Sequence, residues 1–365
     1  MKLENGLVFV GKEFIKADID FEEKINSINL NDSSIEPDCY IVPGFVDIHT
    51  HGALGGDFSD AKADDLPKML DYYAACGVCS ILPTTMTVSE NEICSALKVI
   101  SECDYHGGAK IAGIHIEGPF LNPKKNGAQS ASNIRKPDSN LFDKFNIAAN
   151  GKIKMLTLAC EEEGSEEFIK YVSTKCTVSL GHSAADYNTA MKAFSDGATH
   201  VTHLFNAMNP LGHRAPAIIG AAYDSNASVE LICDGIHVHP SVIRMTAQIY
   251  GDKLNLVSDS SRCSGMPDGL YLLGGQMTEL KNGKATVQGT DTLAGSTISL
   301  IDAVRNLVKY GVKLESAIYA ASTAPADAIK CHDIGRLEKD ACADIVVLDK
   351  SLNIKSVYVD GKRTI

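Results

Sequence analysis

The sequence lacks a surplus of positive charge. It has 34 lysine and arginine residues against 46 aspartate and glutamate residues, which gives a formal net charge of −12 at pH 7. Proteins that bind a nucleic acid or an anionic membrane present basic surfaces that neutralise phosphate groups. We therefore expect neither a nucleic acid nor a membrane as a partner.

The marks of a secreted or membrane-spanning chain are also missing. The first residues, MKLENGLVFVGKEF, do not combine a charged flank with an apolar core and a small-residue cleavage site. Eleven cysteines are scattered from Cys39 to Cys342, without the dense spacing of a disulfide framework. The long uncharged stretch 72–89 is interrupted by Gly77 and Pro83. We expect a cytoplasmic protein.

Several common catalytic motifs are absent as well. The sequence contains no G-x-S-x-G and no Walker motif, and the glycine-rich segment 52–56 lacks the spacing of a dinucleotide-binding loop. These absences argue against a serine nucleophile and against nucleotide chemistry. No internal repeat or low-complexity segment interrupts the chain, which predicts a compact folded protein.

Apolar runs alternate with amphipathic segments over most of the chain. The runs predict eight strands, at 41–51, 80–85, 111–117, 153–160, 177–182, 200–205, 229–236 and 254–259. The segments between them predict helices at 63–76, 90–103, 165–174 and 186–195, one that begins at Pro240, and two more at 297–310 and 314–328. Eight strand-then-helix units predict an α/β fold, the (β/α)8 barrel.

The two ends of the chain follow a different pattern. Short alternating strands with turns fill residues 1–42, and similar strands follow in 343–349 and 354–359. We expect residues 1–42 and 335–365 to pair into a small β-sandwich domain. The barrel, 43–334, is then inserted between its two halves.

Polar side chains that can bind a metal or move a proton follow several of the predicted strands. His49 and His51 alternate onto the same side of the first strand. The others are Glu117, His182, His203, His237 and Asp259. A lone histidine after an apolar run is more often structural, but gathering many such groups at one end of a barrel is costly unless a metal binds them. We predict a metal centre there.

Histidines with one glutamate and one free aspartate suit a zinc-like ion, which lowers the pKa of a bound water toward ~7. Zinc is favoured, while iron, manganese and cobalt stay open. Asp259 would take a proton from the water and pass it to a leaving amine. These residues predict metal-dependent hydrolysis without a covalent intermediate.

The motifs resemble those of the amidohydrolase superfamily and, within it, the deacetylases of N-acetylglucosamine 6-phosphate. The matching segments run in order along the chain: PGFVDIH at 43–49, HIEGPFLN at 115–122, LGHS at 180–183, HLFNAM at 203–208, GMPDG at 265–269 and LAGS at 293–296. The resemblance implies hydrolysis of the acetamide of this phosphorylated amino sugar to glucosamine 6-phosphate and acetate. It also implies a homodimer.

The resemblance assigns roles residue by residue. Glu117, His182 and His203 match the main metal site, and Glu117 is placed where it could bridge two ions. His49 and His51 match a second site, so one or two divalent ions are expected. Asp259 matches the catalytic acid and base. The substrate-binding positions are Ala128, Gln129, Asn206, Ala207, Arg214, His237, Leu293, Ala294 and Gly295.

Arg214 has the planar fork that suits a phosphate. Gln129 departs from the family, because many members have histidine there. Glutamine donates a hydrogen bond but carries no charge, so if this position polarises the substrate carbonyl, slower turnover or an altered substrate preference is expected.

Two rival functions stay open at this point. The first is another amidohydrolase reaction, on a cyclic amide or on another N-acetyl amino sugar phosphate. The second is a barrel that has lost catalysis and serves as a binding scaffold. Intact Glu117, His182, His203 and Asp259 disfavour the scaffold.

Overall fold

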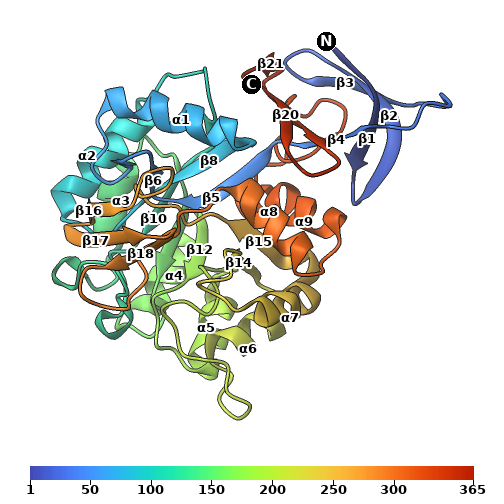
Figure 1. Ribbon diagram of the computed structural model, residues 1–365. Helices are drawn as coiled ribbons and strands as arrows, with labels where there is room; N and C mark the ends of the chain where they lie inside the picture. Colours follow the sequence, from blue (N-terminus) through green and yellow to red (C-terminus); the bar gives the residue numbers. More distant parts are fainter.

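A parallel barrel and a separate terminal sheet make up the computed structural model, which describes residues 1–365 (Figure 1). The barrel strands, in their order around the barrel, are β5 (Phe45–Thr50), β8 (Val78–Thr85), β10 (Ile114–Glu117), β11 (Ile153–Leu158), β12 (Thr177–Leu180), β13 (His200–Val201), β14 (Ser228–Ile232) and β15 (Leu254–Val257). A short strand, β9 (Lys110–Ile111), pairs with β8. All of these pairs are parallel, so the carboxyl ends of the strands meet at one rim.

The barrel is closed between its last and first strands by a few polar contacts. The N–H of Asp259 donates to the carbonyl of His49 at 2.9 Å, and the N–H of Ser258 donates to Asp47 Oδ1 at 3.3 Å. The predicted (β/α)8 fold is confirmed.

At least one helix follows each barrel strand. The helices are α1 (Leu66–Ala75), α2 (Glu90–Ser101), α3 (Ser139–Ala148), α4 (Ser165–Val172), α5 (Tyr187–Asp196), α6 (Ala217–Asp224), α7 (Pro240–Tyr250), α8 (Leu300–Lys309), α9 (Leu314–Ala321) and α10 (Thr323–Ala328). Local sequence sets several of their starts. Ser89 accepts the N–H of Glu92 and Glu92 accepts that of Ser89, which is a capping box at the start of α2. The sequence patterns did not predict α3 and α6.

The two ends of the chain share one seven-stranded sheet. Its order is β21 (Lys362–Arg363), β20 (Ile354–Val359), β19 (Ile345–Asp349), β4 (Cys39–Pro43), β1 (Lys2–Val10), β2 (Glu13–Phe21) and β3 (Ile25–Leu30). The sheet curls over its own core, so that the rings of Phe21 and Tyr358 from distant strands lie 5.3 Å apart. Pairing of the N- and C-terminal segments was predicted from their alternating patterns.

The strand predicted at 41–51 is wrong in one respect, because it is two strands divided at Gly44. β4 belongs to the terminal sheet and β5 to the barrel. Gly44 lies where the terminal sheet contacts the barrel. A Cβ placed on it would lie 2.6 Å from Cys79 Cβ and 2.9 Å from Asp344 Cβ. Only glycine fits this close approach without displacing its neighbours.

A small antiparallel sheet between β15 and α8 was not predicted. It contains β16 (Gly269–Leu273), β17 (Gln276–Lys281) and β18 (Lys284–Val287), and it lies over one side of the barrel (Figure 1). A hairpin of β6 (Gly52–Ala53) and β7 (Gly56–Asp57) follows the first barrel strand. No helix combines the length and the apolar character that crossing a bilayer requires.

Replacing Gly44 with alanine tests the tight junction between the two layers. We expect Gly44→Ala to lower the free energy of unfolding by about 1–3 kcal/mol, because the new methyl group overpacks a filled site. Urea denaturation measures this change. Gly269→Ala is the control, since its Cβ would meet Tyr271 at an ordinary 3.6 Å, and equal losses in both variants would contradict the interpretation.

Candidate metal centre and substrate pocket

The polar residues predicted at the strand ends do gather at the carboxyl rim of the barrel. Glu117 ends β10, and His49 lies in β5 with His51 just beyond it. His182, His203 and Asp259 each come two residues after a strand and adopt positive φ angles of 47°, 28° and 46°. Left-handed backbone is uncommon for such residues and is typical of functional sites.

A first cluster joins Glu117 to two imidazoles. Glu117 Oε1 lies 3.1 Å from His182 Nε2 and 3.0 Å from His203 Nε2. The two Nε2 atoms are themselves 3.1 Å apart. Three electron-rich atoms in such a triangle repel one another unless positive charge lies between them, so the cluster fits a divalent ion.

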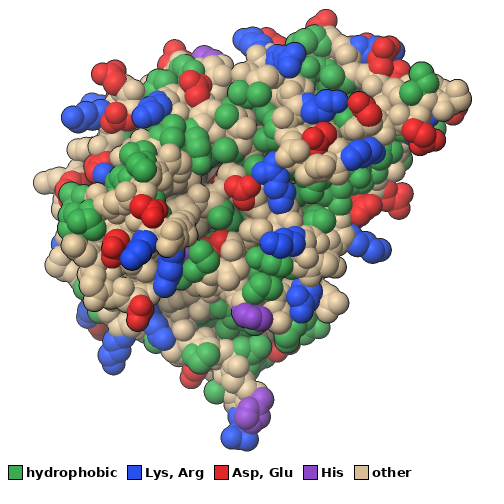
Figure 2. Space-filling view, in the orientation of Figure 1, with side chains coloured by type: hydrophobic (Ala, Val, Ile, Leu, Met, Phe, Trp, Pro, Cys, Tyr) green, Lys and Arg blue, Asp and Glu red, His purple; other side chains and the backbone are tan.

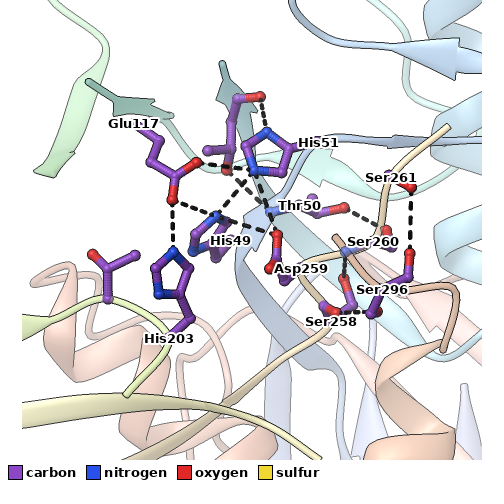
Figure 3. Close-up of polar contacts among 12 residues, drawn as sticks. His49, Thr50, His51, Glu117, His203, Ser258, Asp259, Ser260, Ser261 and Ser296 are labelled. Carbon is purple, nitrogen blue, oxygen red and sulfur yellow. Dashed lines mark hydrogen bonds and ion pairs between the residues drawn. The ribbon is translucent and has the colours of Figure 1, made fainter. Parts of the chain in front are cut away.

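A second cluster uses the other side of the same carboxylate. His51 Nε2 lies 3.2 Å from Glu117 Oε2 and 3.2 Å from His49 Nε2. Asp259 Oδ1 lies 3.4 Å from His51 Nε2 and 3.6 Å from His49 Nε2. Figure 3 shows the Glu117 carboxylate between His203 and the His49–His51 pair, with Asp259 beside that pair. Glu117 is therefore placed to bridge two ion sites.

Hydrogen bonds on the outer nitrogens fix which imidazole nitrogen faces the centre. Nδ1–H of His182 donates to the carbonyl of Lys125 at 2.8 Å, and Nδ1–H of His51 donates to the carbonyl of Thr84 at 3.1 Å. A carbonyl only accepts, so in each neutral ring the lone pair is on Nε2. That nitrogen is the one that points into the cluster, as a metal ligand requires.

The charges of the site favour bound cations. Burial alone would lower the pKa of His49, but the carboxylates of Glu230, Glu117 and Asp259 raise it to about 10. At His51 and His203 burial again lowers the pKa, but nearby carboxylates, Glu117 above all, raise it by more. The pKa of each imidazole is therefore above its ordinary value. Burial would raise the pKa of Glu117, and the imidazoles, His49 first, hold it well below its ordinary value.

A pocket of about 330 Å³ opens above the two clusters, a size within the usual range of small-molecule sites. Most of the predicted site residues line it: His51, Glu117, Ala128, Gln129, His182, His203, Asn206, Ala207, His237, Asp259, Leu293 and Gly295. His49 is fully buried beneath the pocket, and Ala294 is buried behind its wall.

Arg214 is the predicted residue that the structure does not bring to this pocket. It lines a different cavity with Asp186 and Asn209 and is exposed in the loop that leads into α6. The pocket beside the metal centre is lined by Glu117, Asp259 and Asp291, and by no lysine or arginine.

Gln129 makes contacts that the sequence alone did not suggest. Its side-chain oxygen accepts the N–H of Thr87 at 2.7 Å, and its amide nitrogen donates to Glu117 Oε2. Both polar ends of this buried side chain are thus occupied. In this conformation one N–H of the Gln129 amide orients the Glu117 carboxylate, and the second N–H of the same amide has no protein acceptor.

His237 is oriented by a carboxylate on its own loop. Its Nδ1–H donates to Asp234 Oδ2 at 2.6 Å, while Asp234 Oδ1 accepts the N–H groups of Ile236 and His237, both at 2.8 Å. Burial alone would raise the pKa of Asp234, but its contacts with His237 keep it below the ordinary value. The free Nε2 of His237 is left for the pocket.

Glu161 and Glu230 are among the acidic residues near the site that were missed from the sequence. Glu161 accepts hydrogen bonds from Asn122 Nδ2 at 2.8 Å and Ser183 Oγ at 2.5 Å, which ties together two loops of the rim. Glu230 lies inside the barrel against His49. The sequence did contain a signal for Glu230, because an acidic residue is unusual within an apolar run such as VELIC at 229–233.

Comparison with known proteins agrees with this geometry. The sequence profile of the Amidohydrolase family matches residues 40–364. The chain belongs to this family, and the resemblance predicted from its motifs is confirmed.

Relatives with specific activities are similar over most of the chain. The N-acetylglucosamine-6-phosphate deacetylase of Bacillus subtilis (strain 168) is 39% identical over 282 residues, covering 75% of this chain and 71% of the relative. The N-acetylgalactosamine-6-phosphate deacetylase of Escherichia coli O157:H7 is 34% identical over 328 residues, covering 88% and 87%. A mutant N-acetyl-D-glucosamine-6-phosphate deacetylase from Mycobacterium smegmatis, solved with N-acetyl-D-glucosamine-6-phosphate, superposes with a TM-score of 0.93 at 30% identity, covering 100% of this chain and 99% of that one.

The raised imidazole pKa values predict that metal binding depends on pH. Without an ion, His49 with its pKa of about 10 is protonated at neutral pH, whereas a metal ligand must be neutral. Binding therefore releases protons, and zinc affinity falls as the pH is lowered from 8 to 6, by about tenfold per unit for each proton displaced. Competition against a coloured chelator measures the affinity, and an affinity that does not change with pH would contradict the charge assignment.

Proposed function

We propose that this protein hydrolyses the acetamide of N-acetylglucosamine 6-phosphate to glucosamine 6-phosphate and acetate, in amino sugar metabolism. The observation that carries the proposal is the Glu117 carboxylate between two imidazole pairs, with Asp259 beside it on the floor of a small-molecule pocket. The relatives named above supply the substrate class. All eleven cysteines are free thiols, which supports the expected cytoplasmic location.

Five residues of the chain would act as metal ligands in this hydrolysis. Glu117, His182 and His203 would hold one divalent ion and His49 and His51 a second, with zinc favoured over iron, manganese or cobalt. Bound there, a divalent ion polarises the amide carbonyl and lowers the pKa of water.

Asp259 would move the proton. Its Oδ1 faces both imidazoles of the second cluster, where it can accept a proton from water as the water attacks the acetyl carbon. Asp259 then returns the proton to the sugar nitrogen, because an amine leaves poorly unless it is protonated. His237, held by Asp234 at Nδ1, would donate from Nε2 to the acetyl oxygen or the phosphate in its doubly protonated, imidazolium form.

The phosphate requires a cation that one copy of the chain does not supply. The pocket is lined by three carboxylates and by no lysine or arginine, whereas a phosphate ester carries about two negative charges. Arg214 is exposed in the loop between β13 and α6, which projects from the barrel (Figure 1). We propose a homodimer in which Arg214 from a second copy reaches the sugar phosphate.

Acetate release from metal-loaded protein tests the proposed reaction. We expect release from N-acetylglucosamine 6-phosphate to exceed release from the unphosphorylated sugar. The galactosamine epimer is the competing substrate, because one relative at 34% identity is named for it. Faster release from the epimer, or release independent of phosphate, would replace the proposed substrate.

Asp259→Asn tests the assigned proton carrier within the same assay. The amide keeps the size of the side chain but cannot accept the proton, so we expect the turnover number to fall about 100- to 10,000-fold. Asp268→Asn is the control, since Asp268 is exposed and instead accepts the N–H of Asn282 outside the pocket. Similar rates in both variants would remove Asp259 from the mechanism.

Arg214→Ala tests the shared phosphate site. Loss of a charge-assisted contact predicts a KM for the phosphorylated sugar raised by about 10- to 100-fold, with little change for the unphosphorylated sugar. Arg135→Ala, which removes an exposed arginine from another loop, is the matched control. Light scattering gives the oligomeric state, and a monomeric active protein, or equal effects on both sugars, would refute the shared site.

A further inference from the structure

A carboxylate with no assigned role lies inside the barrel beneath the metal centre. Glu230 is on β14, and no part of it is exposed. Transfer of a carboxylate out of water is costly unless hydrogen bonds and charges compensate it. Glu230 must therefore be compensated by its immediate neighbours.

Its hydrogen bonds reach one residue of each metal cluster. Glu230 Oε2 accepts Nδ1–H of His49 at 2.8 Å and the backbone N–H of His203 at 3.0 Å. Glu230 Oε1 lies 3.2 Å from Nε2 of His200. A carboxylate only accepts, so His49 carries its proton on Nδ1, and its Nε2 faces Glu117, His51 and Asp259.

The nearby His115 does not turn this group into a separate ion site. Nδ1–H of His115 donates to the carbonyl of Ile48 at 3.2 Å, and its Nε2 lies 2.7 Å from Thr157 Oγ1. Both ring nitrogens are thus occupied, and burial lowers the pKa of His115 to about 3. Glu230 is directed at His49 and His200 alone among the imidazoles around it.

We propose that Glu230 is a positioning residue that holds the His49 ring for a second metal ion and so determines whether the His49–His51 cluster is loaded. This inference rests on the proposed metal-dependent function. A carboxylate that accepts the outer N–H of a histidine fixes the ring and makes its other nitrogen a better ligand.

The two clusters should not depend on Glu230 equally. His49 has no other partner on Nδ1, so its orientation relies on the Glu230 side chain. The segment of His203 is also held by a backbone bond, from Leu204 N–H to the carbonyl of Glu230 at 2.9 Å. That bond survives any change of the Glu230 side chain, which leaves the first cluster largely in place.

Zinc loading of Glu230→Gln tests the proposal. Full-length protein is dialysed against buffered zinc concentrations, and bound zinc per chain is counted by mass spectrometry. We expect the wild type to bind two ions. In the variant, the second ion should bind about 10- to 100-fold more weakly, while the first changes by less than about threefold.

Cobalt supplies a signature that a loss of stability would not produce. The second equivalent of Co²⁺ should change the visible spectrum of the wild type, and in Glu230→Gln the same change should require about 10- to 100-fold more free Co²⁺. In a His49→Gln background, adding Glu230→Gln should leave the affinity of the one tightly bound ion unchanged, because Glu230 acts through His49.

Asp344→Asn is the matched control. Asp344 is another buried carboxylate, paired with Lys110 Nζ at 2.9 Å far from the metal centre. We expect it to lower stability and to leave both zinc affinities unchanged. Equal weakening of both ions in Glu230→Gln, or normal loading of both, would overturn the role of Glu230.

The wild type separates this inference from the proposed function. A wild type that binds one zinc ion and still releases acetate would overturn the inference while leaving the proposed function intact. A wild type that binds no zinc and releases no acetate would overturn both.

Discussion

The position of one carboxylate, that of Glu117, determines the rest of the site. Its two oxygens face different imidazole pairs, at 3.0 Å from His203 Nε2 on one side and 3.2 Å from His51 Nε2 on the other. Glu117 can reach both pairs because it ends β10, which lies in the barrel between β5 on one side and β12 and β13 on the other. Gln129 orients it from above. A displaced Glu117 would leave the buried imidazoles of His182 and His203 without the carboxylate that now lies between them.

The surrounding barrel holds strained residues in place around this carboxylate. Asp259, at a positive φ of 46°, is fixed through its backbone to His49 and to Ser296, whose N–H donates to the carbonyl of Asp259 at 2.7 Å. Hydroxyl groups continue the network, as Figure 3 shows, with Thr50 Oγ1 2.8 Å from Ser260 Oγ. These contacts join the first and last strands, so the same contacts that close the barrel also place Asp259.

Local patterns predicted the features that depend on neighbouring residues. Alternation in a strand placed His49 and His51 together, and the barrel rule placed His182 and His203 at the same rim. Glu230 was missed because its role depends on a hydrogen bond with His49, which is 181 residues away in the sequence. Local patterns do not show such a contact. Helix α6 was missed because its apolar residues show no helical period. Arg214 lies away from the pocket in one copy of the chain, and a local sequence pattern does not place an exposed loop.

The charge distribution fits the proposed small anionic substrate, which would bind to metal ions and to few lysine or arginine side chains. Figure 2 shows side chains of both signs spread over one face, without a continuous basic patch, and the net charge is −12.

Zinc anomalous diffraction from crystals of the zinc-loaded full-length protein tests the metal centre most directly. We expect a peak within bonding distance of Glu117 Oε1, His182 Nε2 and His203 Nε2. Zinc confirmed in the protein but found only away from Glu117 would contradict the central role of this carboxylate.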